Sequence, residues 1–491
     1  MAANSLLLLR LVLAGAMLLL LTRTDADPDL WGHVRFGLDM LATGTLPAVD
    51  PYSFTSDVPW VNHEWLSELA MGMAYRVGGN AGLVALKLAC IAVIVLALHG
   101  GLRRFRTDPR TYDVFMTLVL ISIWPRLVPI RPQIFSFACF AILLTIVRGV
   151  REGRRHVEWA LPPLFAVWVN LHGGWIVGLA AVAIWLPFTV AAAATARRRI
   201  LLAAAATASL AATLVNPYGF GLWRFLLNTV GLSRPVIYDW QPFSALPWPI
   251  LLLEAVFPLF VAVRMIGSRT RPPVAHAGVA LLLAALTWRV SRVDVFFHLS
   301  LALLIVPSLH AARHPAAAPA DARPAWRPAQ LAIVGVTTVL FIAAAAANAR
   351  HVHLRAGLQL DAGALAYLRD VAEPRRLLTW YNWGEYALWH LAPSGVRVSM
   401  DGRRETVYSE QVVDDHFAFY DGEARLLRYP DAIGADAIWL PATMPVVPRL
   451  VADGWREAYR SDVSVVLVRG GGTREPQRHK GVVSAGVFPG P

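Results

Sequence analysis

The chain has 491 residues, of which 56% are hydrophobic and 16% are charged. Soluble domains carry roughly a quarter charged residues, so this composition excludes an ordinary soluble protein and predicts a polytopic α-helical membrane protein. The formal charge of +12 comes almost entirely from arginines in short loops between apolar runs, a pattern typical of topology signals and lipid headgroup contacts rather than of nucleic-acid binding. Cys90 and Cys139 lie inside apolar runs, which argues against a disulfide framework or a cysteine metal site.

About eleven apolar runs predict the membrane-spanning helices, and several are near the lower length limit for crossing a bilayer. The first run could instead be a signal peptide, since Thr24-Asp25-Ala26 loosely resembles a cleavage site. Its weak polar start and the many spans that follow favour an uncleaved first span. In chain order the runs are 5–22, 81–100, 112–128, 133–148, 159–171, 173–195, 200–215, 247–264, 274–290, 294–310 and 329–348.

Arginine-rich loops alternate with arginine-poor ones, which predicts the orientation of the chain. The arginine-rich loops are 101–106, 148–155, 197–199, 264–271 and 313–327. If these loops face the cytoplasm, the N-terminus is cytoplasmic. Residues 23–80 and everything after residue 349 are then external.

The external loop that follows the first span carries Asp25, Asp27 and Asp29, with His33 one helical turn later. Carboxylates crowded at a membrane surface are costly unless they bind something. Pro28 disfavours helix at Asp27, so Asp29 can begin the next helix, where it would stay ionised and could act as a general base. The Asp27-Pro28-Asp29 spacing could also hold a divalent cation with a substrate phosphate. The alternative is a solvated cluster that only caps the helix.

Other polar residues gather at the predicted external ends of spans and describe a polar cavity open to that side. His63 and Glu64 could be an acid/base pair or ligands; alternatively they begin an interfacial helix capped by Asn62. His172, beside two glycines, could donate to a substrate or simply end a helix. Four arginines could bind an anionic group or snorkel to headgroups: Arg126, Arg131, Arg289 and Arg292.

The C-terminal part has a different character. Residues 311–329 are a Pro/Ala-rich linker, and residues 355–470 predict a small α/β domain with an amphipathic helix at 359–371. Its β-like runs are 376–380, 396–400, 436–440 and 463–468. The predicted division is a membrane domain 1–349 with external loop 23–80, an external α/β domain 350–470 and a disordered tail 471–491.

Several short segments resemble the GT-C superfamily of membrane glycosyltransferases, in a bacterial branch similar to protein O-mannosyltransferases and aminoarabinose transferases. The resemblance rests on the topology and on Asp27-Pro28-Asp29-Leu30-Trp31, Val61-Asn62-His63-Glu64-Trp65-Leu66, Arg131-Pro132-Gln133, Trp168 to Gly174, Asn216-Pro217-Tyr218-Gly219, Asn382-Trp383-Gly384 and Asp401-Gly402-Arg403.

The resemblance implies a bacterial inner-membrane enzyme that transfers a sugar, with inversion, from a polyprenyl-phosphate donor on the external face. The acceptor would be a glycan, a lipid or a protein. A loop-one aspartate would be the base, but this loop lacks the adjacent Asp-Glu pair of better-known members, so either Asp29 or Asp27 could correspond and metal use stays open. External arginines would neutralise the departing phosphate. The alternatives are a lipid-linked oligosaccharide transporter or polymerase component, and a non-catalytic membrane scaffold.

Overall fold

The computed structural model describes residues 2–105, 108–229, 231, 238–269, 271–309, 328–469, 477–478 and 486–490. The chain divides into two compact units, unit 1 (Met1–Thr24 and Val84–Arg350) and unit 2 (Asp25–Leu83 and His351–Pro491). This differs from the division expected from the sequence, because residues 25–83 fold with the C-terminal residues and not with the membrane helices. The two segments pair over a long distance in sequence, since backbone bridges join Asp25 to His353 and Ser53 to Val398.

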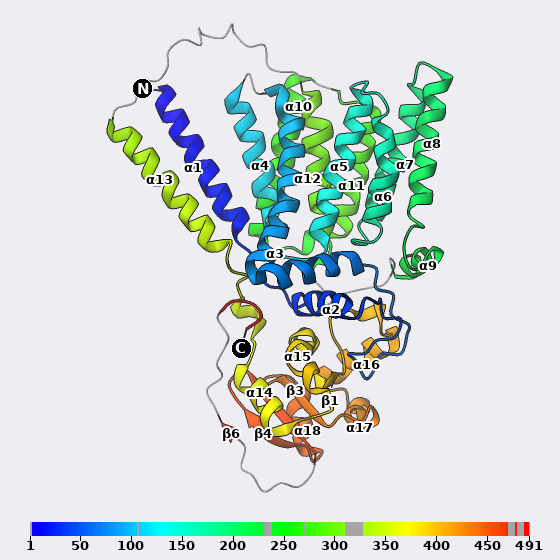
Figure 1. The fold of residues 1–491 in the computed structure, drawn as a ribbon, viewed down its shortest axis with the longest axis vertical. Coiled ribbons are helices and arrows are strands. Elements are labelled where there is room, and N and C mark those ends of the chain that lie inside the picture. The colour runs from blue at the N-terminus through cyan, green and yellow to red at the C-terminus, as the bar shows by residue number, and fades with distance from the viewer. Residues whose placement is uncertain are drawn as a thin grey trace. The chain divides into compact units, whose positions relative to one another are not determined.

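Unit 1 consists of helices (Figure 1). Helix α3 (Trp65–Leu102) is divided between the units. It is broken at Gly79, whose backbone is not helical and has a positive φ (φ 55°, ψ −137°). The other helices of unit 1 are α1 (Ala2–Thr22), α4 (Pro109–Leu127), α5 (Gln133–Arg151), α6 (Leu161–Trp168), α7 (Trp175–Ala191), α8 (Ala196–Ala212), α9 (Phe220–Thr229), α10 (Trp248–Ser268), α11 (Val274–Arg289), α12 (Asp294–Ser300) and α13 (Pro328–Asn348).

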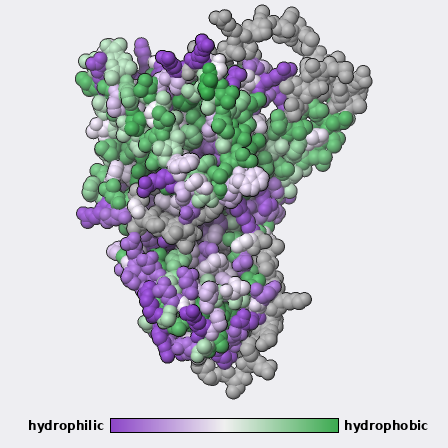
Figure 2. All heavy atoms as spheres, turned by 180° about the vertical axis from the view of Figure 1, so that it is seen from behind, coloured by the Kyte–Doolittle hydropathy of each residue, from purple (hydrophilic) through white to green (hydrophobic). Residues whose placement is uncertain are grey.

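The helices of unit 1 pack in pairs and leave a large apolar outer surface. Helix α1 packs against α13, α6 against α8, α7 against α11 and α4 against α10. Large side chains on α10 and α13, such as Leu259, Val263 and Val339, are mostly exposed. Hydrophobic residues accordingly dominate the visible surface of unit 1 in Figure 2. Contiguous apolar surface of this extent is unusual for a protein in water and suits a lipid environment.

Five helical segments of the described residues are long and apolar enough to cross a membrane: Trp65–Leu102, Gln133–Arg151, Trp248–Ser268, Ser291–Ser308 and Leu331–Asn348. Three shorter apolar helices, Arg10–Thr22, Trp175–Ala191 and Val274–Arg289, stand beside them. The predicted count of eleven spans is therefore not confirmed. The run expected at 159–171, for example, contains only the eight-residue α6.

Unit 2 contains a six-stranded mixed sheet with the order β2-β1-β3-β5-β4-β6. Strand β1 runs parallel to β2 and β3, while β5 is antiparallel to β3 and β4. The four predicted strands correspond to the first three strands and β5, and the sequence reading missed β4 and β6. The strands are β1 (Arg376–Thr379), β2 (Arg397–Val398), β3 (Ala437–Pro441), β4 (Arg456–Arg460), β5 (Ser464–Val468) and β6 (Gln477–Arg478).

In the described part of unit 2, the sheet is accompanied by the first part of α3 and by six further helices. A core that includes Leu378, Ile438, Trp455 and Leu467 fills the space between the sheet and its covering helices. The amphipathic helix expected at 359–371 is α14, continued by a π-helical turn to Ala372. The helices are α2 (Leu30–Thr43), α14 (Ala362–Tyr367), α15 (Gly384–Leu391), α16 (Glu410–Tyr420), α17 (Tyr429–Ala432) and α18 (Val446–Ala452).

The end of the chain is an ordered part of unit 2 where it is described. Phe488 is 2% exposed and packs against Trp31, Tyr75 and Trp389, and the Trp31 indole donates to Pro489 O at 2.8 Å. Residues 477–478 and 486–490 thus differ from the disordered tail expected at 471–491. The rest of that tail lies outside the described residues, as do residues 310–327, which include nearly all of the expected linker at 311–329.

Candidate active site

Helix α2 begins at the cluster of acids that the sequence singles out. Asp29 occupies the N-cap position, as Pro28 predicts, with φ −86° and ψ −6°. An N-cap aspartate normally accepts a hydrogen bond from the second or third amide of its helix, but the Asp29 side chain makes no capping hydrogen bond. Asp27 beside it is buried, and Asp25 pairs with Arg355 at 2.6 Å.

The cap of α2 comes from a distant residue, Glu385 at the start of α15. The N–H of Gly32, the third residue of α2, donates to Glu385 Oε2 at 2.9 Å. Glu385 is 2% exposed. A Cβ on Gly402 would clash with Asp29 Oδ1 and would lie only 3.0 Å from Glu385 Oε1. The two carboxyl groups therefore meet around the backbone of Gly402, at a point where only glycine leaves room for them.

The environment of Glu385 favours its neutral form. Burial raises its pKa, and the charges of Asp29 and Asp401 raise it further, well above the ordinary value for a glutamate, against an opposing effect of Arg403. A neutral carboxylic acid beside Asp29 avoids the repulsion that two neighbouring carboxylates would suffer. Asp29 and Glu385 thus form an unequal pair in which Glu385 favours the neutral form.

Arg403 holds the loop before α3 against the 401–403 turn. Its guanidinium binds both oxygens of Asp50, at 2.7 and 3.0 Å, and pairs with Asp401 at 2.6 Å. Burial alone would lower the pKa of Arg403, but Asp401 and Asp50 raise it well above its usual value. The guanidinium lies 4.9, 5.4 and 4.8 Å from the ring centroids of three aromatic residues, namely Phe36, Tyr52 and Trp60. The role of Arg403 is therefore to fix the walls of this region.

His33, one turn after Asp29, is held as a cation by acids of the same unit. Its Nδ1 lies 3.2 Å from Glu68 Oε1. Burial acts to lower the pKa of His33, but the hydrogen bond to Glu68 and the charges of Glu64, Glu68 and Asp29 raise it to about 9. A protonated His33 on the first turns of α2 adds to the positive end of the helix dipole near Asp29.

His63 and Glu64 lie just before α3. His63 Nε2 is 3.6 Å from Glu64 Oε1, and the Glu64 N–H donates to Asn62 Oδ1 at 3.2 Å. The Asn62 amide also donates to Glu68 Oε2 at 2.5 Å. This is the arrangement expected of a helix start stabilised by Asn62, with Glu64 contributing charge to His33.

Unit 1 has its own cluster of charged residues, built from predicted arginines. Arg126 pairs with Asp294 at 2.7 Å and also with Asp239, which in turn binds Arg131 at 2.7 Å. Arg292 stacks 4.9 Å over the ring of Trp240. Burial acts to raise the pKa of Asp239, but Arg131, Arg126 and Arg292 lower it to about 2. Three of the four predicted arginines therefore converge on one loop carboxylate.

The fourth predicted arginine and the predicted histidine of unit 1 are placed differently. Arg289 is the exposed last residue of α11, and among the described residues no ion pair joins it to Asp239 or Asp294. His172 Nδ1 accepts from the Gly174 N–H at 2.9 Å and contacts Ser136 Oγ at 2.8 Å. His172 thus shapes the turn before α7, which is the structural role considered for it from the sequence.

Metal ligands do not converge in the part of the chain that is described. No group of three or more His, Cys, Asp or Glu side chains there is arranged to hold a metal ion. Asp27 and Asp29 alone do not make such a set. The divalent cation that their spacing suggested thus has no three-ligand site among the described residues.

No protein-family model matches the chain, and no curated protein does either. Among solved structures it is similar to ArnT from Cupriavidus metallidurans bound to undecaprenyl phosphate, with a TM-score of 0.51 and 13% identity over 96% of this chain and 99% of that one. The apo structure of the same protein gives a TM-score of 0.52 and 14% identity over 95% and 98%.

The chain has the GT-C fold. This confirms the resemblance drawn from the sequence and the prediction of a polytopic membrane protein. At 13–14% identity the likeness to ArnT concerns the fold, so the chemistry rests on the residues described above.

Within this GT-C chain, the structure brings Asp29 and His33 together in unit 2 and Arg126, Arg131 and Arg292 together in unit 1. Sequence reasoning missed Glu385 and Glu68, the two acids that complete the surroundings of Asp29. Glu385 directly follows Asn382-Trp383-Gly384, one of the segments on which the resemblance rests, but 353 positions separate it from Gly32. No local spacing could reveal that contact.

Proposed function

We propose that the protein is a membrane glycosyltransferase that moves a sugar from a polyprenyl-phosphate-linked donor to an acceptor hydroxyl on the external face of a bacterial inner membrane. The observation that carries this proposal is the likeness to ArnT over nearly the whole of both chains, since one ArnT structure holds undecaprenyl phosphate. The acidic cluster of unit 2 and the arginine cluster of unit 1 supply the two kinds of group that such a reaction needs.

Asp29 is the proposed general base. Its carboxylate removes the proton of the acceptor hydroxyl, the oxygen attacks the anomeric carbon of the donor, and the bond from that carbon to the phosphate oxygen breaks with its electron pair. The products are the glycosylated acceptor, with inverted configuration, and polyprenyl phosphate. A base must be ionised to act. The cation at His33, the helix N-terminus and the proton held on Glu385 all favour an ionised Asp29.

Glu385 is a positioning residue for Asp29. Because it accepts the Gly32 N–H, the cap of α2 is complete without the Asp29 carboxylate. Asp27, buried two residues earlier, is the second candidate for the base. Glu64 and His63 act on the same site through the charge of His33 and the start of α3.

The arginine cluster is the proposed site of the donor phosphate, whose charge grows as the leaving group departs. Arg131 is the first choice, because its side chain is 31% exposed against 12% for Arg126. A guanidinium has five N–H donors, so Arg131 can bind a phosphate while it keeps Asp239. Arg126, held by two aspartates, shapes the cluster, and Arg292 stands beside it on Trp240.

A transfer assay tests this function. The purified chain in lipid nanodiscs is incubated with undecaprenyl-phosphate sugars that carry a radiolabelled glucose, mannose, galactose or aminoarabinose, together with a delipidated bacterial envelope extract as acceptor. We expect label from at least one donor to move into the acceptor fraction. Asp370→Asn is the matched control for Asp29→Asn, since Asp370 is an exposed acid of unit 2, and this control should keep the transfer activity. If the radiolabel of every donor stays on the donor, the proposal is contradicted.

Orientation is tested separately by labelling single cysteines in intact cells. Thr45 and Asp370 are exposed positions on the segments proposed to be external, and Gly153 is exposed in the proposed cytoplasmic loop. A membrane-impermeant maleimide should label cysteine at 45 and 370 but not at 153. Labelling at 153 alone would reverse the orientation and remove the external reaction site.

A further inference from the structure

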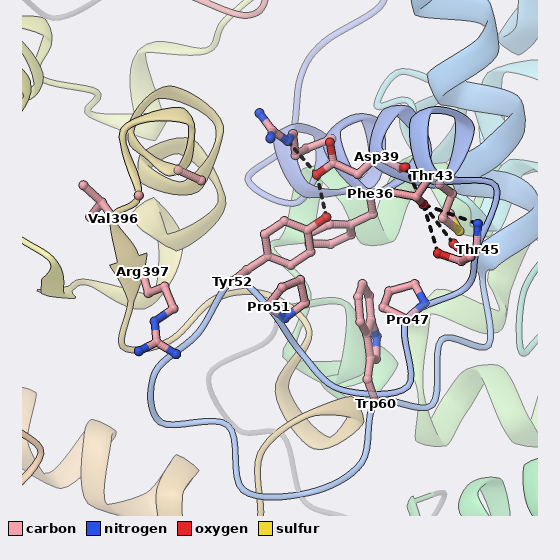
Figure 3. Close-up of a pocket in the computed structure, with 14 residues that line it drawn as sticks. Phe36, Asp39, Thr43, Thr45, Pro47, Pro51, Tyr52, Trp60, Val396 and Arg397 are labelled. Atoms are coloured by element: carbon pink, nitrogen blue, oxygen red, sulfur yellow. Dashed lines mark hydrogen bonds and ion pairs between the residues drawn. The ribbon is translucent and has the colours of Figure 1, made fainter.

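Unit 2 contains a pocket of about 480 Å³ whose lining includes neither Asp29 nor Glu385 (Figure 3). It is formed by the second half of α2, by the loop between α2 and α3, and by residues 392–397 at the edge of the sheet. Its volume is within the range of sites that bind small molecules. The proposed reaction does not use it.

One wall of the pocket is a row of polar groups along α2. Asp39 Oδ2 accepts from Arg35 Nε at 2.8 Å and from the Tyr52 hydroxyl at 2.6 Å. The hydroxyls of Thr43 and Thr45 follow one another, 3.1 Å apart, at the end of the helix. Figure 3 shows Asp39 and Thr43 on α2, with Thr45 just beyond the end of the helix. The wall therefore alternates hydrogen-bond donors and acceptors at close spacing.

The facing wall is apolar and rigid. Pro47, Pro51 and Trp60 stand across from the polar row in Figure 3. Trp60 is 3% exposed, and the Arg403 guanidinium lies 4.8 Å from its ring centroid. Two prolines and a clamped indole lose little freedom when a ligand enters, so this wall is preorganised.

We propose that this pocket binds a sugar residue of a saccharide chain. A sugar offers closely spaced hydroxyls, each a donor and an acceptor, along one edge and C–H groups on its faces, which match the two walls. A lipid tail would displace water from the Arg35–Asp39 pair without offering it a hydrogen bond. A phosphate would face the Asp39 carboxylate, which also neutralises Arg35.

The position of the pocket along α2 indicates the length of the saccharide, and this step rests on the proposed function. Arg35 is six residues beyond Asp29, which corresponds to about 9 Å along a helix, and Thr43 is about 21 Å beyond it. One sugar ring cannot fill the pocket and also present its hydroxyl at Asp29. The pocket therefore holds a neighbouring residue of the acceptor, which makes the acceptor an oligosaccharide or polysaccharide chain.

The test is protection of a single cysteine and needs no turnover. Thr45→Cys places a thiol in the pocket at an exposed position, while the native Cys90 and Cys139 are buried. The full chain in nanodiscs is labelled with a maleimide in the presence of cellotetraose, maltotetraose or a hyaluronan tetrasaccharide. A saccharide at ten times its Kd should slow the labelling about elevenfold, from the bound fraction. Asp370→Cys serves as the control and should label at an unchanged rate.

Variants separate recognition from simple crowding. Asp39→Asn and Arg35→Gln, each in the Thr45→Cys background, should weaken the protection, since each removes one charge of the Arg35–Asp39 pair and changes the donors and acceptors of the α2 wall without a large change of volume. The proposal is overturned if none of the three tetrasaccharides slows the labelling. It is also overturned if the protection survives both variants, or if inorganic phosphate protects equally well. Protection by a tetrasaccharide without any sugar transfer would uphold the pocket and refute the enzyme, so the two failures are distinguishable.

Discussion

Replacing Glu385 by glutamine tests whether this residue holds a proton beside Asp29. Glutamine keeps an oxygen that can accept the Gly32 N–H and has nearly the same volume, but it cannot ionise. The charged groups that act on Glu385 are Asp29, Asp401 and Asp27, which raise its pKa, and Arg403, which lowers it. If Glu385 is neutral in the folded protein, Glu385→Gln changes little near pH 5.

The difference between the two proteins should grow with pH. The folded state binds the Glu385 proton more tightly than the unfolded chain, so this proton stabilises the fold fully below the ordinary glutamate pKa of about 4.3. That contribution is lost as the pH rises towards the raised pKa of the folded state. Glu385→Gln has no such loss. Its free energy of unfolding, relative to that of the native protein, should therefore rise by up to about 1.4 kcal/mol for each pH unit within that window.

The assay is thermal unfolding in nanodiscs at pH 5, 6, 7 and 8, with Glu410→Gln as the matched control because Glu410 is exposed at the start of α16. The Tm of Glu385→Gln minus that of the native protein should rise across this series, and the control difference should stay flat. A Glu385→Gln difference that is constant or falls with pH would show that Glu385 is ionised and would refute the unequal carboxyl pair.

Glu385→Ala should behave differently from the glutamine variant. It leaves the Gly32 N–H without its acceptor, and losing a helix cap costs about 0.5–2 kcal/mol. Asp29 can then rotate to accept that N–H itself, which withdraws the proposed base from the acceptor. We therefore expect Glu385→Ala to lose far more turnover than Glu385→Gln; equal turnover in the two variants would argue against a positioning role.

Three further outcomes follow from the contacts described. Arg131→Gln should raise the Kd for an undecaprenyl-phosphate sugar while leaving the Tm nearly unchanged, whereas Arg126→Gln should lower the Tm because the buried Asp294 loses its arginine and Asp239 keeps only Arg131, and breaking a buried pair costs about 3–5 kcal/mol; the reverse ranking would misplace the phosphate. His33→Gln should be less stable than the native protein at pH 6.5, and that difference should disappear as the pH passes about 9, which pH-dependent unfolding checks directly. Phe488→Ala should destabilise unit 2 by about 3–5 kcal/mol, and an unchanged Tm would mean that the end of the chain does not pack as described.

The local features of the site could be predicted from the sequence. Pro28 restricts Asp27 and places Asp29 at the start of α2, and the apolar spacing that follows predicts an amphipathic helix. The position of His33 one turn later needs only helical geometry. Strands β1, β3 and β5 were predictable because short apolar β-like runs between turn residues have few other interpretations.

The remaining features depend on contacts between distant parts of the chain. The sequence does not show that residues 25–83 fold with residues 351–491, because the pairings of Asp25 with His353 and Ser53 with Val398 are set by tertiary structure. The same holds for Glu385 at Gly32 and for Phe488 at Trp31. The count of eleven spans stays a prediction, because an apolar run does not reveal where a helix begins, breaks or ends, as the break of α3 at Gly79 illustrates.

The most direct test of the central claim is the rate at which undecaprenyl phosphate is released from an undecaprenyl-phosphate sugar in the presence of acceptor, measured by mass spectrometry for the native protein and for Asp29→Asn. General base catalysis is worth about a hundredfold to ten-thousandfold in rate. The account predicts release by the native protein, a loss of that size in Asp29→Asn with donor binding unchanged, and a smaller loss in Asp27→Asn. Equal release by the native protein and by Asp29→Asn would contradict it.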